Sequence, residues 1–322
     1  MNRLGTINRV FDLKIILLAV CFLLTSCGSK QAKAIEDEKQ STSAIGYELP
    51  MPIVPDTLRS VEARANYVAS HYWDAMDFSN RQISTDTAFI EQNFANFVAI
   101  LGLTEISNAD KAICRLVNRV SVDTAAFSLL AATAGKYLDE PNSPMRNEEL
   151  YIYFLKYFID SSITTEAESL RYDNRLTEAM KNRRGTRAAD FNFIDRDGVA
   201  ARLSDAVGKA DVTLLVFYDP DCSHCKEIIG RIADIPLPAG VDVLAIDAEG
   251  DRSRWDATKS SMPAGWRVGF ATTPILDKEL YSLPASPTLY LLDRDATVIM
   301  KDPAVDEAIA FITSPTTTNI HR

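Results

Sequence analysis

The residues from Thr213 to Ile229 constrain the fold of this chain more than any other stretch. An apolar, β-rich run from Val212 to Tyr218 is short enough for a buried strand, and a turn containing Pro220 follows it. Beyond the turn, apolar residues recur at the spacing of one helical face, namely Cys225, Ile228, Ile229 and Ile232. The sequence therefore predicts a buried strand that leads through a short turn into an amphipathic helix.

Two cysteines two residues apart, Cys222 and Cys225, lie at the junction of this strand and helix. Cys222 is expected near the first residue of the helix, where unpaired backbone N–H groups and the positive end of the dipole stabilise an anion. A thiolate there is easier to form and more reactive at neutral pH. The short gap lets Cys225 reach back and close a disulfide, so the pattern predicts a redox-active pair.

Three other interpretations of the pair are possible. A zinc site needs four ligands. The remaining candidate ligands form no second paired motif, so no metal is predicted. These candidates are His71, Cys114, His224 and His321. A purely structural disulfide stays possible, although so short a loop gains little from chain restriction. A peroxidatic cysteine usually has a hydroxyl residue three positions earlier, where this chain has Asp219. The redox pair is the favoured interpretation.

The N-terminus has the pattern of a signal peptide. Basic residues within positions 2–14 precede an apolar run, Ile15 to Leu24, that is too short to span a bilayer. The following Leu24-Thr-Ser-Cys27 resembles a bacterial lipobox. That resemblance implies cleavage after residue 26 and lipidation of Cys27; an ordinary signal peptide remains the alternative. We expect an exported protein, lipid-anchored to an envelope membrane and facing the periplasm, with surface display possible.

The next two segments differ in composition. Residues 27–48 are polar and lack periodicity, which predicts a flexible tether. Residues 49–182 show helical spacing without a catalytic constellation, so a helical domain is expected. The first helix is predicted to open within Asp56 to Glu62 with an acidic or hydroxyl cap. The others are predicted to cover about 86–101, 108–120, 123–138, 148–160 and 165–182. An aromatic stripe in the fifth is interpreted as core: Tyr151, Tyr153, Phe154, Tyr157 and Phe158.

One cysteine is left over once the others are assigned. Cys21 lies in the signal peptide, Cys27 carries lipid, and Cys222 pairs with Cys225. Cys114 remains, within a predicted helix whose apolar face is formed by Ile113, Leu116, Val117 and Val120. A free thiol outside the cytosol is a liability unless it is buried, so a buried core cysteine is predicted.

Residues 183–322 return to a strand-rich pattern and are expected to form a second domain. Residues 190–205 read as a hairpin that turns at Asp195 to Gly198. Strands are expected at 241–246, within 283–293 and at 297–300, and a short extended piece at 265–268. Helices are expected at 251–260 and 305–312.

Residues from about Gly185 to Thr313 resemble a thioredoxin-fold domain of the TlpA-like thiol–disulfide oxidoreductases. Three motifs carry the resemblance: Asp190-Phe-Asn-Phe, Phe217-Tyr-Asp-Pro-Asp-Cys-Ser-His-Cys225 and Ser286-Pro-Thr-Leu-Tyr-Leu-Leu-Asp293. The whole layout also resembles exported lipoproteins in which a helical domain of unknown function precedes such a module. The implied fold is α+β, with an N-terminal all-α domain and a C-terminal thioredoxin-like α/β domain whose central mixed sheet is flanked by helices.

The resemblance also assigns residues. It implies that Pro287 is cis and faces the cysteine pair, with Ser286 beside it; a proline there leaves the neighbouring backbone free to pair with an extended substrate. The approach to Cys222 departs from the family, because Asp219 and Asp221 occupy a segment that often contains Trp. Two carboxylates oppose thiolate formation while His224 and the helix N-terminus favour it, so the net effect stays open.

The predicted function is thiol–disulfide exchange with protein substrates. Cys222 attacks, Cys225 resolves the mixed disulfide and His224 tunes the thiolate. The resemblance implies a reductase supplied by a membrane electron donor. A scaffold or binding lipoprotein with a vestigial thioredoxin module is the alternative. The net charge of −10 disfavours nucleic acid as a partner, and no motif indicates a cofactor.

Overall fold

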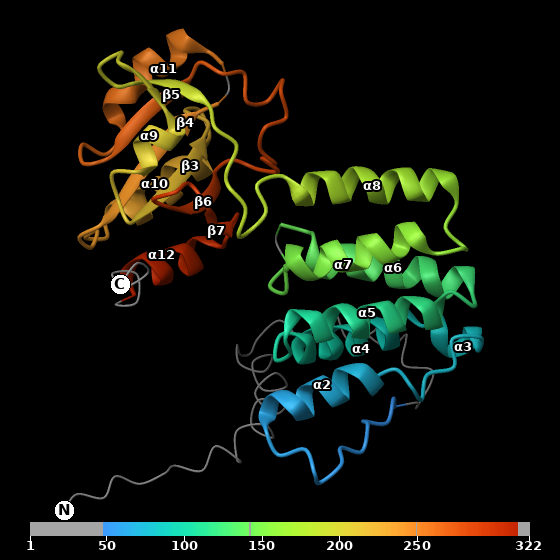
Figure 1. The fold of residues 1–322 in the computed structure, drawn as a ribbon. Helices are drawn as coiled ribbons and strands as arrows, with labels where there is room; N and C mark the ends of the chain where they lie inside the picture. The colour runs from blue at the N-terminus through green and yellow to red at the C-terminus, as the bar shows by residue number, and fades with distance from the viewer. Residues whose placement is uncertain (1–47, 142, 249, 315–322) are drawn as a thin grey trace, which may run out of the picture. The chain divides into compact units, whose positions relative to one another are not determined.

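The computed structural model describes residues 48–141, 143–248 and 250–314 (Figure 1). Within these ranges, helices come first along the chain and a mixed sheet with its own flanking helices follows. The predicted α+β organisation, with helices N-terminal and a mixed sheet C-terminal, agrees with this order.

The helical segment contains α2 to α8, and polar side chains cap most of these helices. Their bounds are α2 (Val61–His71), α3 (Arg81–Ser84), α4 (Thr87–Leu101), α5 (Ile106–Val120), α6 (Thr124–Leu138), α7 (Glu148–Asp160) and α8 (Glu166–Met180). Asp86 and Asp123 accept backbone N–H groups at the starts of α4 and α6, and Thr165 forms a capping box with Glu168 at α8. α2 opens within the predicted stretch, and its cap is the hydroxyl residue Ser60, which accepts the N–H of Ala63.

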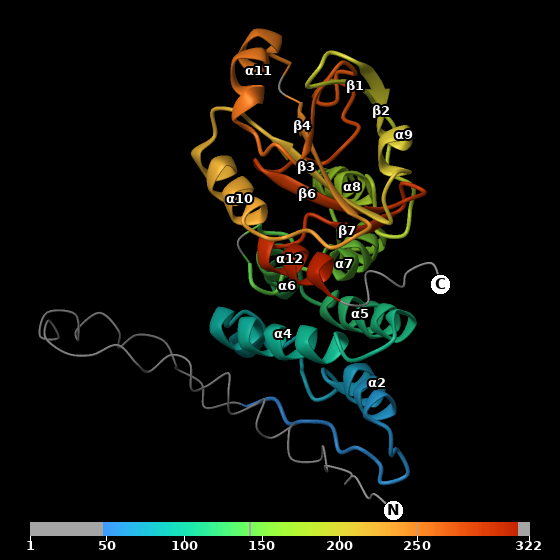
Figure 2. The same ribbon diagram turned by 90° about the vertical axis from the view of Figure 1, so that its left-hand side faces the viewer.

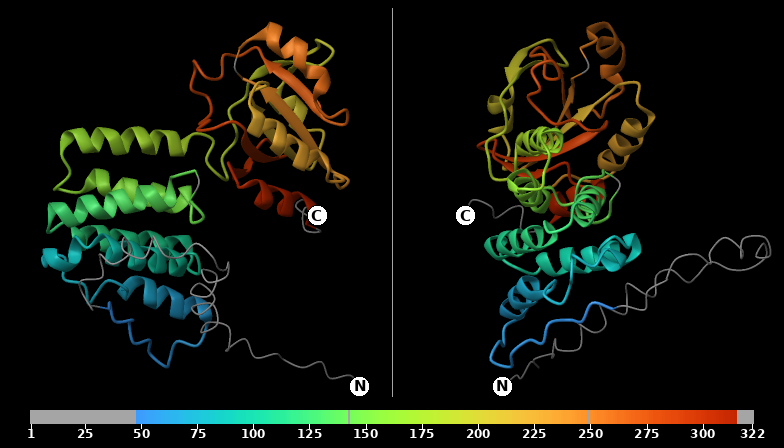
Figure 3. Two further views of the ribbon diagram at one scale, coloured as in Figure 1. Left: turned by 180° about the vertical axis from the view of Figure 1, so that it is seen from behind. Right: turned by 90° about the vertical axis from the view of Figure 1, so that its right-hand side faces the viewer.

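The helices of this segment run side by side around one apolar core (Figures 1 and 3). Phe94, Phe154 and Phe158 are completely buried, and their rings contact one another in series at centroid distances of 5.5 and 5.8 Å. Tyr151 is buried as well, whereas Tyr153 and Tyr157 are half-buried at the edge. The interpretation of the α7 aromatic stripe as core is therefore confirmed for its central residues.

The sheet contains seven strands among the described residues, in the order β2-β1-β5-β4-β3-β6-β7. Their bounds are β1 (Asn192–Asp195), β2 (Ala200–Arg202), β3 (Val212–Tyr218), β4 (Val241–Asp247), β5 (Arg267–Ala271), β6 (Thr288–Asp293) and β7 (Val298–Lys301). β3, β4 and β5 are mutually parallel, whereas the pairs β1–β2, β1–β5, β3–β6 and β6–β7 are antiparallel. The sheet is mixed, and the predicted hairpin is β1–β2.

Side chains of β3 alternate between two cores, as a strand buried on both faces requires. Leu214 and Val216 pack with α10 (Ser223–Ala233) and α12 (Val305–Thr313), while Leu215 and Phe217 pack with α9 (Leu203–Val207). Figure 2 shows α10 and α9 on opposite sides of the strands. α11 (Arg252–Thr258) and a 3₁₀ turn (Lys259–Ser261) follow β4. The cysteine-bearing helix α10 is thereby fixed against the strand that precedes it.

The helical segment and the sheet belong to one compact unit, and ion pairs connect them at β7. Lys301 on β7 contacts Glu148 at the start of α7 at 3.0 Å, and Asp302 accepts from Arg146 at 2.6 Å. The side chain of Lys301 is only 5% exposed. Because these pairs are largely removed from solvent, removing one partner is expected to cost more stability than breaking a pair on an open surface.

Candidate functional site

The cysteine pair is positioned by a short turn between β3 and α10. β3 ends at Tyr218, and the side chain of Asp219 accepts the N–H of Asp221 at 2.9 Å. The carbonyl of Asp219 accepts the N–H of Cys222 at 3.2 Å, and Cys222 is the N-cap residue of α10. Asp219 therefore shapes the turn through both its side chain and its backbone, as Asp commonly does.

The sulfur of Cys222 has hydrogen-bond partners on two different elements. It accepts the backbone N–H of Cys225 at 3.2 Å, as the predicted place at the helix N-terminus requires. Its thiol donates to the carbonyl of Ser286 at 3.6 Å. The half-buried Cys222 thus lies between the N-terminal N–H groups of the helix, which favour negative charge, and the loop before β6.

The loop that contains Pro287 reaches this place because β6 pairs with β3. Phe217 and Thr288 are opposite each other in the antiparallel ladder, so the residues just before β6 lie next to the residues just after β3. The Ser286–Pro287 peptide bond is cis, as the resemblance implies. Residues 64 positions apart in sequence, Cys222 and Ser286, are brought into contact by this register.

Cys225 differs from Cys222 in being completely buried. It packs with Ile228, Ile229 and Ile232 of its own helix in the core on that face of the sheet. Burial, together with the hydrogen bond and charge of Cys222 and the charge of Asp219, raises the pKa of Cys225 to about 12, against a lowering contribution from the backbone hydrogen bond of Asp219. Both cysteines are free thiols in this structure, and Cys225 is held neutral at pH 7.

His224 lies on the outer side of α10. Its side chain is 63% exposed, and Nδ1 is 3.5 Å from the carboxylate of Glu227, one turn further along the helix. The structure therefore gives His224 an acidic neighbour that the sequence analysis did not consider. Its influence on the Cys222 thiolate stays a prediction.

An arginine that the sequence analysis did not identify contacts both carboxylates before Cys222. Arg254 on α11 is 3.2 Å from Asp221 and 3.8 Å from Asp219. The order of the strands could in principle have predicted this contact. β3 and β4 are parallel neighbours, so the segments that follow them emerge at the same edge of the sheet. A basic residue in the helix after the second strand could have been placed near the cysteines on that ground.

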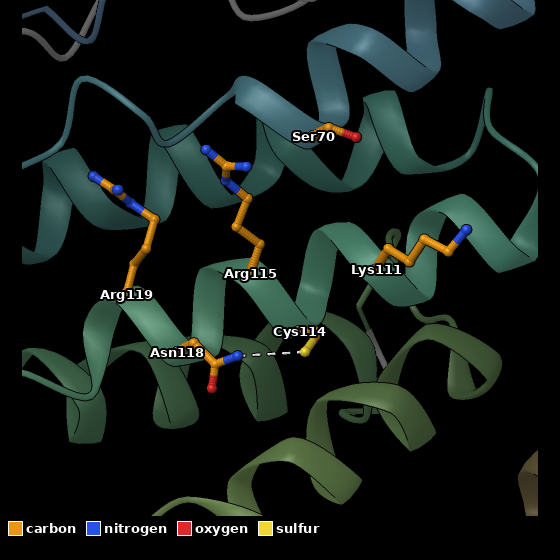
Figure 4. A pocket seen from close by; sticks show the side chains of 6 residues that line it. All are labelled: Ser70, Lys111, Cys114, Arg115, Asn118 and Arg119. Carbon is orange, nitrogen blue, oxygen red and sulfur yellow. Dashed lines mark hydrogen bonds between the residues drawn. The ribbon is translucent and has the colours of Figure 1, made fainter.

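Cys114 is not the buried core residue that was predicted. Ile113, Leu116, Val117 and Val120 are buried, but Cys114 lies about 100° further around the helix from Ile113 and is half-buried. Its sulfur accepts from Asn118 at 3.4 Å (Figure 4). It lines a pocket of about 600 Å³ with residues of α2 and α5, namely Ser70, Lys111, Arg115, Asn118 and Arg119. The prediction was wrong because this position borders the apolar face.

Several predicted features lie outside the described residues: the signal peptide, Cys27 and nearly all of the tether. In the part of the chain that the structure describes, no helix is long and apolar enough to cross a membrane. The same residues contain no group of three or more His, Cys, Asp or Glu side chains placed to hold a metal ion.

Comparison with known proteins identifies the family. A thioredoxin-like protein from Bacteroides caccae is 31% identical, and the match covers 86% of this chain and 99% of that one, with a TM-score of 0.76. The chain therefore belongs to the thioredoxin-like proteins. A domain family of unknown function, DUF5106, matches residues 26–182, which include the helices α2 to α8.

Shorter solved structures match about two fifths of the chain. A conserved protein of unknown function from Bacteroides fragilis is 36% identical over 40% of this chain and 98% of its own, with a TM-score of 0.38. The thioredoxin domain of a thiol–disulfide oxidoreductase from Bacteroides vulgatus is 15% identical over 40% of this chain and 98% of its own, with a TM-score of 0.31. No curated protein matches the chain.

Proposed function

We propose that this protein is a thiol–disulfide oxidoreductase that exchanges disulfides with protein substrates through Cys222 and Cys225. The observation that carries the proposal is the position of the Cys222 sulfur. It lies at the N-terminus of α10, within hydrogen-bond distance of the Cys225 N–H and of the Ser286 carbonyl beside Pro287. One thiol is reachable and the other is buried directly behind it, which is the asymmetry that two-step exchange requires.

In the first step, the Cys222 thiolate attacks one sulfur of the substrate disulfide. The substrate S–S bond breaks, a Cys222–substrate disulfide forms, and the displaced substrate sulfur leaves as a thiolate that takes a proton from water. The helix N-terminus stabilises the attacking anion. The Ser286–Pro287 backbone borders the reacting sulfur, so an extended substrate segment can pair beside it.

In the second step, Cys225 loses its proton and attacks the Cys222 sulfur. The mixed disulfide breaks, the Cys222–Cys225 disulfide forms, and the second substrate sulfur leaves and becomes a thiol. Two electrons pass from the cysteine pair to the substrate. Because burial raises the pKa of Cys225, this thiol stays protonated and out of side reactions until the neighbouring sulfur is bonded to substrate.

The test is to trap the intermediate. Cys225→Ser removes the resolving thiol, so the variant is expected to accumulate substrate proteins on Cys222 as mixed disulfides that a small thiol reductant releases. Peptide mass spectrometry locates the linkage. Cys114→Ser is the matched control, since it removes a thiol elsewhere and should trap nothing. If Cys225→Ser carries no adduct and the parent protein reduces no small disulfide, the proposal is wrong and a scaffold role is favoured.

We further propose that the pair works as a reductase. The support is the resemblance of the cysteine-bearing domain to the TlpA-like oxidoreductases, which are expected to act as reductants. The reduction potential of the Cys222/Cys225 pair, equilibrated in glutathione buffers, is therefore expected at or below about −250 mV. A potential near about −120 to −180 mV would instead indicate an oxidase or isomerase.

A further inference from the structure

The guanidinium of Arg254 lies between two carboxylates of the turn that leads to Cys222. It is 3.2 Å from Asp221 and 3.8 Å from Asp219, and its side chain is 28% exposed. Asp219 is 29% exposed, so this pair is partly shielded from solvent, while Asp221 is 66% exposed. Arg254 comes from α11, which is distant from the turn in sequence. The arrangement therefore exists only in the folded protein.

Asp219 acts on the buried thiol in two opposite ways. The negative charge of its carboxylate raises the pKa of Cys225, whereas its backbone hydrogen bond lowers it. The carboxylate also shapes the turn by accepting the N–H of Asp221. A cation held against this carboxylate offsets its negative charge and so reduces the rise in the pKa of Cys225. The backbone hydrogen bond of Asp219, which lowers that pKa, is preserved because the side chain stays in place.

We propose that Arg254 is a positioning residue of the cysteine pair, which holds Asp219 and Asp221 in place and offsets their negative charge so that a thiolate can form beside them. The inference rests on the proposed thiol–disulfide exchange for its biological purpose. It accounts for how a thiolate could form at Cys222 with Asp219 and Asp221 in the segment that precedes it. The sequence left open whether the acidic approach suppresses the thiolate, and the proposal assigns the offsetting charge to a residue 32 positions beyond Cys222.

The other charged groups around this site come from four elements. His224 and Glu227 face each other on α10. Against the lowering effect of burial, the hydrogen bond of Asp221 and the charges of Asp219, Asp221 and the buried Asp247, at the end of β4, raise the pKa of Arg254. Burial raises the pKa of Tyr218 on β3, with the charge of Asp247 adding to the shift. Arg196 in the β1–β2 turn donates to backbone carbonyls of residues 262 and 263. Among the ion pairs of the described residues, Arg254 is the cation that contacts the turn before Cys222.

The test measures thiolate formation without requiring disulfide exchange. Full-length reduced protein is alkylated with neutral iodoacetamide over a range of pH, and the Cys222 peptide is quantified by mass spectrometry. In Arg254→Gln we expect the midpoint of the pH–rate profile to rise by about one pH unit. The rate at pH 7 is expected to fall only about threefold, because a more basic sulfur is also more nucleophilic.

Three further variants separate charge from structure. Arg254→Lys keeps the positive charge, so the midpoint of its pH–rate profile should lie close to the parental value. Asp219→Asn with Asp221→Asn, added to Arg254→Gln, should return the midpoint to the parental value, since the amide introduced at position 219 keeps the oxygen that shapes the turn. Arg252→Gln is the matched control: it lies on the same helix and pairs with Asp256 rather than with the turn, so its profile should not move.

The inference is overturned if the Arg254→Gln profile coincides with the parental one, or if the two Asn substitutions fail to reverse the shift. Should Arg254→Gln not fold, the Asp219→Asn/Asp221→Asn variant with Arg254 intact decides. The midpoint of its pH–rate profile should fall below the parental value. An unchanged midpoint would refute the charge effect. If the midpoint shifts, but Cys225→Ser traps no substrate and the parent protein reduces no small disulfide, the proposed function is refuted and this inference stands.

Discussion

Cys222→Ser is expected to lose disulfide exchange by at least about a thousandfold, because the variant lacks the thiol that attacks the substrate in the proposed mechanism. The loss should not come from unfolding. Cys222 is the N-cap residue of α10, and serine is among the best residues at that position. The rate of reduction of a neutral dipyridyl disulfide, followed by the absorbance of the released pyridinethione, measures the effect, and the melting temperature checks the fold.

Cys114→Ser provides the comparison for this variant. Cys114 is also a half-buried free thiol, but its sulfur accepts from Asn118 on α5 and lies in a pocket of the helical segment. Its replacement should leave the exchange rate unchanged. Persistent exchange in Cys222→Ser, or loss of exchange in Cys114→Ser, would place the reactive sulfur elsewhere than we propose.

The parts of the site that depend on local sequence were predictable. A run of apolar residues and the following 3.6-residue spacing defined β3 and α10 within two residues, because both patterns report burial of the segment itself. Pro287 was found through the resemblance of its motif, and the structure places its loop beside Cys222. Cys222 follows β3 and Pro287 precedes β6. Both strands are apolar along most of their length, and such strands are readily recognised in a sequence.

The parts that depend on strand order were not predicted. Arg254 reaches Asp219 because β4 lies next to β3, and no periodicity within residues 251–260 reports that neighbour. Local signals also left a choice where two candidates compete. Asp56 and Ser60 are both good N-cap residues, and Ser60 is the one that accepts a helical N–H, from Ala63. The short α9 is below the length at which an amphipathic pattern can be recognised.

The contacts of Lys301 also depend on how distant parts of the chain pack together, and we expect them to affect stability strongly. Its ammonium group contacts the carboxylate of Glu148 at 3.0 Å and donates to the carbonyls of Glu178 and Ala179 at the end of α8, at 3.2 and 3.0 Å. One buried side chain on β7 therefore satisfies groups from two helices. Burial lowers the pKa of Lys301 and raises that of Glu148, so desolvation opposes the charge on both partners.

Lys301→Met is therefore expected to lower the free energy of unfolding by about 3–5 kcal/mol, because it leaves a partly buried carboxylate and two helix-end carbonyls without their donor. Denaturant titration measures the loss. Lys136→Met is the matched control. Lys136 contacts Glu91 at 2.6 Å, closer than Lys301 contacts Glu148, but its side chain is 59% exposed, so stability should change little.

The double variant Lys301→Met/Glu148→Leu tests the physical cause. If the loss in Lys301→Met came from the missing attraction between the charges, removing Glu148 as well could not restore it. Because both pKa values indicate that burial opposes charge here, we expect the double variant to recover more than half of the loss, as buried pairs replaced by apolar side chains commonly do. A double variant no more stable than Lys301→Met would show instead that the unpaired charge of Glu148 is not the cause, and that the lost attraction or the helix-end carbonyls of Glu178 and Ala179 carry the effect.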